Sequence, residues 1–225
     1  MKLQQFIHWD SYILLGISIL MLSAFVSFPK FLSDPLNLAY YLALMVPSYG
    51  LREYLHLRAA KKLGHEASYA LWWPGLIAGA FTALFSNGLL RFLVPGFVVI
   101  KNGIKKDGML QFGYAGIKAN LAFLIAASFI DSPIARDFAI LNALFSFISL
   151  IPIKPFYGEY IFKGSVPIWL LTFIITLFFF WANMAGITAD QLVQLFTNLS
   201  GLFMLALVLL LMIAMLAGFL GIRKE

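Results

Sequence analysis

The stretch that decides the fold class is Val166–Ala185, which reads VPIWLLTFIITLFFFWANMA. A helix needs about 20 predominantly apolar residues to cross a bilayer, and this stretch has that length without a single Asp, Glu, Lys or Arg. A helix that is apolar on every side belongs in a large core or in lipid. We therefore expect Val166–Ala185 to cross a membrane.

The composition of the whole chain points to the same class. Of its 225 residues, 62% are hydrophobic and 12% are charged, and the mean hydropathy is +0.90, whereas soluble domains carry about 25% charged residues. The absence of Cys excludes disulfides, thiolate metal sites and cysteine nucleophiles. The net charge of +6 comes from basic residues in short loops beside apolar runs, where they set orientation in a bilayer. We predict an all-α polytopic membrane protein whose partners include the lipid bilayer and no nucleic acid.

Several other segments are apolar and long enough to be considered as spans. The full set is Ser11–Phe28, Leu36–Leu51, Ala70–Leu93, Tyr114–Ile130, Phe138–Ile153, Val166–Ala185 and Leu199–Leu220. The β-branched piece Phe97–Ile100 lies between Pro-Gly and Asn-Gly pairs and is typical of a strand or hairpin arm. We expect one membrane domain, 1–225, with a first span in 1–35, a core in 36–163 and two spans in 164–225.

Charge placement selects a topology, because basic loops stay on the cytoplasmic side. If Ala70–Leu93 crossed fully, Lys101, Lys105 and Lys106 would lie outside. If it turns back near Asn87, those lysines and every later basic loop lie inside. We predict six full spans, one re-entrant or broken hairpin, and cytoplasmic N- and C-termini in a cell membrane. The alternative is seven spans with one misplaced basic loop.

Two polar clusters are expected on the same side of this membrane domain. Arg52 and His56 are four residues apart and share a helix face, with Glu53 beside them. The second cluster is the stretch 150–159, in which two prolines stop a helix. Ionisable groups at membrane depth are functional candidates by default. The alternative for the first cluster is a plain helix end with snorkelling charges.

These stretches, in this order, resemble the site-2 protease (peptidase M50) family of intramembrane zinc metalloproteases, in its compact archaeal form. The sequence R-E-Y-L-H-L-R-A-A-K-K-L-G, from 52 to 64, resembles the family's H-E-x-x-H-x-x-x-A-x-x-x-G. The family's A-G-P-x-x-N appears as A-G-I-K-A-N from 115 to 120, and its N-x-x-L-x-x-x-N-L-x-P-x-P-P-x-D-G appears from 142 to 158. Matching positions are Glu53, His56, Ala60, Gly64, Ala115, Gly116, Asn120, Asn142, Pro152, Pro155 and Gly158.

The resemblance implies a zinc ion held by two His and one Asp, with the Glu as general base. Here Arg52 stands at the first His, Tyr157 at the Asp, and Ser149 at an Asn. A permanent cation repels Zn²⁺, and a phenol with a pKa of about 10 is a poor ligand near neutrality. We therefore predict a pseudoprotease without zinc or active catalytic residues, in which Glu53 is a vestigial base and His56 a vestigial ligand. We expect Arg52 to pair with Glu53 or to stack on Tyr157.

The predicted function is non-catalytic: binding a membrane-protein segment in the former substrate cleft, or serving as a subunit or regulator of a membrane complex. Phe97–Ile100 would offer a strand edge to an extended partner; the alternative is a strand capped within the protein. A second hypothesis is an active zinc protease with atypical ligands, in which Glu159 joins His56. A third, a transporter or channel, lacks a ladder of acids and inverted repeats.

Overall fold

The computed structural model describes residues 6–7, 10–87, 92–101, 103–198 and 206. This part of the chain is mostly helical and includes one small antiparallel sheet of strands β1 (Phe6–Ile7), β2 (Ala67–Trp72) and β3 (Gly96–Ile100), in the order β1-β2-β3. The helical elements, in chain order, are α1 (Ser11–Ser27), η2 (Lys30–Leu32), α2 (Leu36–Met45), η3 (Val46–Gly50), α3 (Leu51–Lys62), α4 (Trp73–Phe85), α5 (Lys106–Tyr114), α6 (Ile117–Ser128), α7 (Pro133–Leu150), α8 (Gly158–Gly164), α9 (Val166–Ala185) and α10 (Ala189–Thr197).

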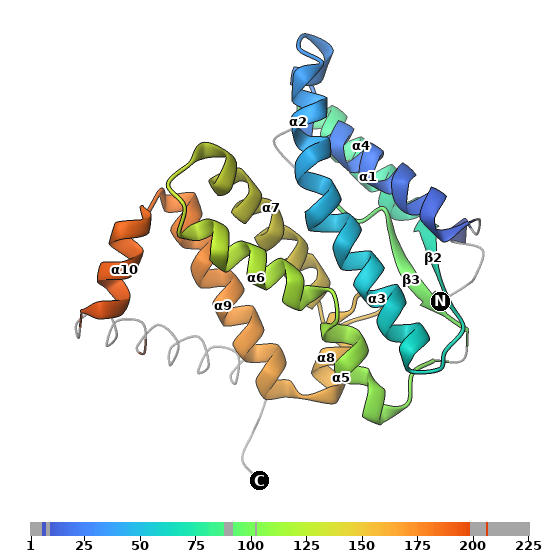
Figure 1. Cartoon of the computed structure of the whole chain (residues 1–225). Coiled ribbons are helices and arrows are strands. Elements are labelled where there is room, and N and C mark those ends of the chain that lie inside the picture. Colours follow the sequence, from blue (N-terminus) through green and yellow to red (C-terminus); the bar gives the residue numbers. More distant parts are fainter. Residues whose placement is uncertain (1–5, 8–9, 88–91, 102, 199–205, 207–225) are drawn as a thin grey trace.

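The helices form two groups (Figure 1). Helices α6, α7 and α9 pack together on one side, and α1, α2, α4 and the sheet lie on the other. Helix α3 contacts both groups, because it packs on β2 and β3 as well as on α5 and α6. A cluster on α3 is therefore placed to connect the two halves of the structure.

One long helical segment, Leu36 to Lys62, carries the first polar cluster. It contains a π-helical turn at Val46–Gly50, which includes Pro47. Proline cannot donate a backbone hydrogen bond inside a helix, and single π turns are frequent at functional sites. The segment ends at Gly64, whose φ of +79° suits glycine. The N–H groups of Gly64 and His65 close this end onto the carbonyls of Lys61 and Ala60.

Three helices are long and apolar enough to cross a membrane, which supports a membrane protein. They are Lys106–Ser128, where α5 and α6 follow one another, Pro133–Leu150 and Val166–Ala185. The other expected full spans are not shown: α1 is apolar but has 17 residues, and α2 continues into the charged α3. The expected span Leu199–Leu220 lies outside the described residues, apart from Ala206.

The apolar segment 70–93, which we expected to form a re-entrant or broken hairpin, is divided between a strand and a short helix. Residues 70–72 belong to β2, and α4 has only 13 residues, about 20 Å of helix at 1.5 Å per residue. The chain then returns, because β3 pairs antiparallel with β2 and the Trp72 N–H donates to the Pro95 carbonyl at 2.8 Å. The segment therefore leaves the sheet and comes back to it, as a hairpin would, and is not a single crossing.

Candidate functional site

Arg52 and Glu53 form a buried ion pair on α3. Their residues are 5% and 1% exposed. Glu53 Oε1 accepts from Arg52 Nε at 2.9 Å and lies 2.8 Å from Arg52 Nη2. The pairing of Arg52 with Glu53 was one of the two arrangements expected from the sequence. It neutralises both charges in an interior where an unpaired charge would be costly.

The Arg52 guanidinium also ties α3 to α7. Its Nη1 donates to the Phe145 carbonyl at 3.2 Å and to Ser149 Oγ at 3.0 Å. Its Cζ lies 4.5 Å from the centre of the Tyr49 ring and 4.9 Å from that of Phe145. The cation therefore stacks on these two rings, whereas the alternative to the Glu53 pair had placed it on Tyr157.

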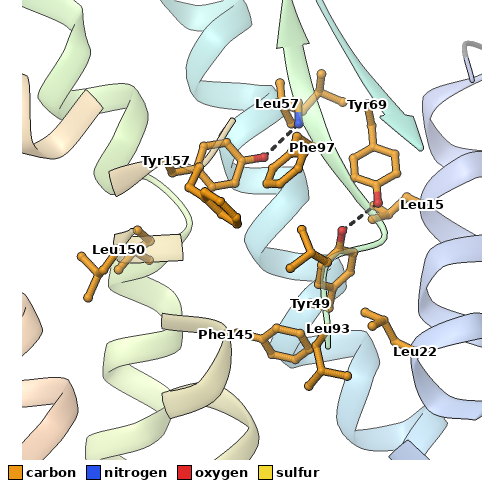
Figure 2. Close-up of a cluster of buried hydrophobic side chains, with 14 of the residues drawn as sticks. Leu15, Leu22, Tyr49, Leu57, Tyr69, Leu93, Phe97, Phe145, Leu150 and Tyr157 are labelled. Atoms are coloured by element: carbon orange, nitrogen blue, oxygen red, sulfur yellow. Dashed lines mark hydrogen bonds between the residues drawn. The ribbon is translucent and has the colours of Figure 1, made fainter. Parts of the chain in front are cut away.

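Tyr157 links the other oxygen of Glu53 to the sheet. Its hydroxyl donates to Glu53 Oε2 and accepts from the Val98 N–H of β3 at 2.9 Å. Figure 2 shows this hydroxyl directed at the strand. A tight turn after α7 places Tyr157 there. This turn requires glycine at position 158, because a Cβ on Gly158 would overlap the Leu150 carbonyl.

His56 lies one helical turn after Arg52 and stacks on the Tyr157 ring. The ring centres are 3.6 Å apart and the planes differ by 10°. His56 Nδ1 is 2.9 Å from the Phe112 carbonyl, and only an N–H can bond to a carbonyl, so Nδ1 carries a proton. Nε2 is buried and has no hydrogen-bond partner among the described residues.

Gly116 and the two asparagines bring α6 and α7 against this segment. A Cβ on Gly116 would overlap the Arg52 carbonyl and the His56 ring, so glycine permits the closest approach of α6. One turn on, Asn120 Nδ2 donates to the Ser48 carbonyl at 2.9 Å and to Asn142 Oδ1 at 2.8 Å. Asn142 Nδ2 in turn donates to Ser48 Oγ at 3.0 Å. The two asparagines therefore hold the π-helical turn in place.

The remaining candidate residues lie around the cluster without joining it. Ala60 and Ala115 are buried, Gly64 ends the helical segment, Pro152 is exposed and Pro155 half-buried. Glu159 pairs with Lys163 at 2.6 Å on the same helix. One Glu159 oxygen is therefore engaged by a cation, whereas the active-protease alternative requires Glu159 to bind a metal ion together with His56.

Sequence reasoning missed a chain of hydroxyl groups next to the cluster. Tyr49 and Tyr69 share a hydrogen bond of 2.7 Å (Figure 2). Tyr69 also shares one of 2.6 Å with Ser18, and Tyr49 donates to the Gly96 carbonyl at 3.1 Å. The only available signal was Pro47, because a proline within an apolar span marks an irregular turn.

The described side chains do not fit the zinc ion that the resemblance implies. A catalytic zinc takes three protein ligands and keeps one open position. In the part of the chain that the structure describes, no three His, Cys, Asp or Glu side chains lie close enough to hold a metal ion. His56 offers one nitrogen, and Arg52 places a permanent cation on the same helix face, where it opposes a second cation.

Comparison with known proteins finds a protease-like relative. The chain is similar to a protein of Methanocaldococcus jannaschii named "Putative zinc metalloprotease", with 26% identity over 169 residues that cover 70% of this chain and 85% of the relative. No protein-family model matches the chain, and no solved structure matches it. The similarity indicates a protease-like membrane protein.

Proposed function

We propose that this chain is a catalytically inactive membrane protein on a site-2-protease-like scaffold. Its former catalytic centre has become a structural connection between α3, α7 and β3. One observation carries the proposal: three of the positions that depart from the family's motifs, Arg52, Ser149 and Tyr157, are bonded to one another directly or through Glu53. Unrelated losses at a dead site would give no reason for such mutual bonding.

The bonding also accounts for the loss of chemistry. A general base must reach the proton that it removes. Both Glu53 oxygens are already engaged, one by Arg52 and the other by the Tyr157 hydroxyl. Arg52 and Tyr157 therefore stand at two of the family's metal-ligand positions, and they also bind Glu53, which stands at the position of the general base.

A proteolysis assay tests the proposal. Wild type and Glu53→Gln would be incubated in detergent with a panel of single-span membrane peptides, with and without added Zn²⁺. We expect the same background cleavage for both proteins under both conditions. Cleavage that depends on zinc and is lost in Glu53→Gln would overturn the proposal.

An active zinc protease is the second candidate, and one observation favours it. His56 Nε2 is buried and has no partner in the described part of the chain, while Nδ1 bonds to a carbonyl, which is the usual arrangement of a metal-binding histidine. Against it, the family's other two ligand positions hold the Arg52 cation and the Tyr157 phenol ring.

We also propose that the partner is a segment of another membrane protein. At β3 the backbone edge is partly capped within the protein, because the Val98 N–H bonds to Tyr157 and the Gly96 carbonyl to Tyr49. An extended peptide would have to displace these tyrosines, so a helical segment is the favoured occupant. Stoichiometric copurification of a membrane protein from the native membrane would support this; isolation of the chain alone after mild crosslinking would oppose it.

A further inference from the structure

A second polar region lies at the other end of α7. The candidate spans Lys106–Ser128 and Val166–Ala185 end at this region, and the candidate span Pro133–Leu150 begins there. Exposed apolar side chains occur at the same ends, including Ile130, Ile134 and Trp181. Tryptophan is enriched where a bilayer meets water. These features are typical of a region at the level of lipid head groups.

A cleft of about 350 Å³ opens between these ends. Its volume falls at the lower end of the range for small-molecule sites. The lining combines one cation and one anion with uncharged polar groups and backbone. The polar residues are Ser128, Asp131, Ser132, Arg136, Asn183 and Thr188.

Arg136 has a structural role that does not use the whole guanidinium. Its Nε donates to the Asn183 carbonyl at 2.7 Å and its Nη2 to the Met184 carbonyl at 3.2 Å. These bonds cap the C-terminal end of α9, where a cation is favoured. The guanidinium has further N–H groups, and these have no partner among the residues that the structure describes.

The cleft also holds acceptors that Arg136 does not engage. Asp131 Oδ1 accepts from the Ala189 N–H at 2.9 Å, yet Asp131 forms no ion pair with Arg136 within the described residues, although both line the cleft. Asn183 is 7% exposed. Its amide nitrogen donates to Ser128 Oγ and the Phe179 carbonyl, while its Oδ1 has no partner in the described part. The free N–H groups of Arg136 and the side-chain oxygens of Asp131 and Asn183 therefore line the cleft without bonding to one another within the described residues.

We propose that this cleft binds the zwitterionic head group of an aminophospholipid. The phosphate would bond to the free N–H groups of Arg136, since guanidinium matches phosphate geometry. The ammonium would bond to the Asp131 carboxylate and to Asn183 Oδ1. A phosphate without an amine would face the Asp131 charge uncompensated. This site is independent of the Arg52 cluster and of the proposed function.

Native mass spectrometry of the full chain in detergent tests the proposal with two lipids. We expect phosphatidylethanolamine to be retained at one per chain and phosphatidylglycerol to bind about tenfold more weakly, because the latter lacks the amine. Soluble phosphoethanolamine should displace the bound lipid. Equal retention of the two lipids, or binding of the soluble compound without the lipid, would overturn the proposal.

Variants locate the binding. Arg136→Gln should weaken phosphatidylethanolamine binding about tenfold, whereas Arg58→Gln, an exposed cation on α3, should not. Asp131→Asn should reduce the preference for the ethanolamine lipid, with Asp190→Asn as the control. Ser132→Phe fills the cleft without removing a side-chain hydrogen bond and should abolish retention. Undiminished binding in Ser132→Phe would place the lipid elsewhere and overturn the assignment.

Discussion

At the scale of single residues, the hydroxyl of Tyr157 carries two contacts that the ring does not. It joins Glu53 to β3, while the ring stacks on His56. A phenylalanine at this position would keep the stacking and lose both hydrogen bonds. The contribution of the hydroxyl can therefore be measured separately from the packing of the ring.

Tyr157→Phe should lower stability by about 1–3 kcal/mol, because it leaves the buried Val98 N–H without a partner and removes one from Glu53. Thermal unfolding in detergent would measure the change. Tyr54→Phe removes the hydroxyl of a residue on α3, next to Glu53, that is 39% exposed, and should have no effect. Equal melting temperatures for wild type and Tyr157→Phe would contradict the bonding described for this hydroxyl.

The Arg52–Glu53 pair should behave as a buried ion pair. Arg52→Met leaves a buried carboxylate without its cation and should cost about 3–5 kcal/mol, whereas the double variant Arg52→Met/Glu53→Met should lose much less. Lys101→Met, which breaks the exposed pair with Glu66 at the end of β3, should leave the melting temperature unchanged. A double variant as unstable as Arg52→Met would show that the loss of stability does not come from a buried carboxylate without its cation.

The sequence allowed part of this cluster to be predicted. The order and spacing of the motifs predicted that α3, the start of α6 and the turn after α7 would meet, and the structure places them together. The stacking partner of Arg52 was not predictable, because Tyr49 reaches it from a π-helical turn whose geometry depends on tertiary contacts through Asn142 and Ser48.

At the scale of elements, the close approach of α6 to α3 depends on one glycine. Gly116→Ala should cost about 1–3 kcal/mol, because its Cβ would overlap the Arg52 carbonyl and force the helices apart. Gly16→Ala in α1 is the matched control, since a Cβ there meets nothing within 4 Å. Thermal unfolding of both variants would measure the difference. Equal stability of the two variants would mean that α6 can move away from α3 without a loss of stability.

The elements differ in how well local sequence predicts them. The helix Val166–Ala185 was predicted with its observed bounds, because a uniformly apolar stretch between Ser165 and Gly186 favours a single helix. Strand β2 was missed, since its residues Ala67–Trp72 run into an apolar helix and become a strand only by pairing with β3. Such non-local pairing is not contained in the periodicity of one segment.

At the scale of the whole molecule, the returning path of the chain between β2 and β3 predicts its orientation in the membrane. The chain has no Cys, so single cysteines can be labelled without background. Lys62→Cys and Lys105→Cys should react with a membrane-impermeant reagent from the same side, and Asp190→Cys from the opposite side. Labelling of the first two from opposite sides would show that the segment between them crosses the bilayer.

The central claim is that Arg52 and Tyr157 occupy the place of a metal centre. Metal content per chain tests it most directly, measured on protein purified without added zinc and without a metal-binding tag, beside the variant Arg52→His/Tyr157→Asp. We predict zinc far below one per chain in the wild type, because one imidazole and a buried cation cannot hold it, and uptake approaching one per chain in the variant. Near-stoichiometric zinc in the wild type would contradict the account.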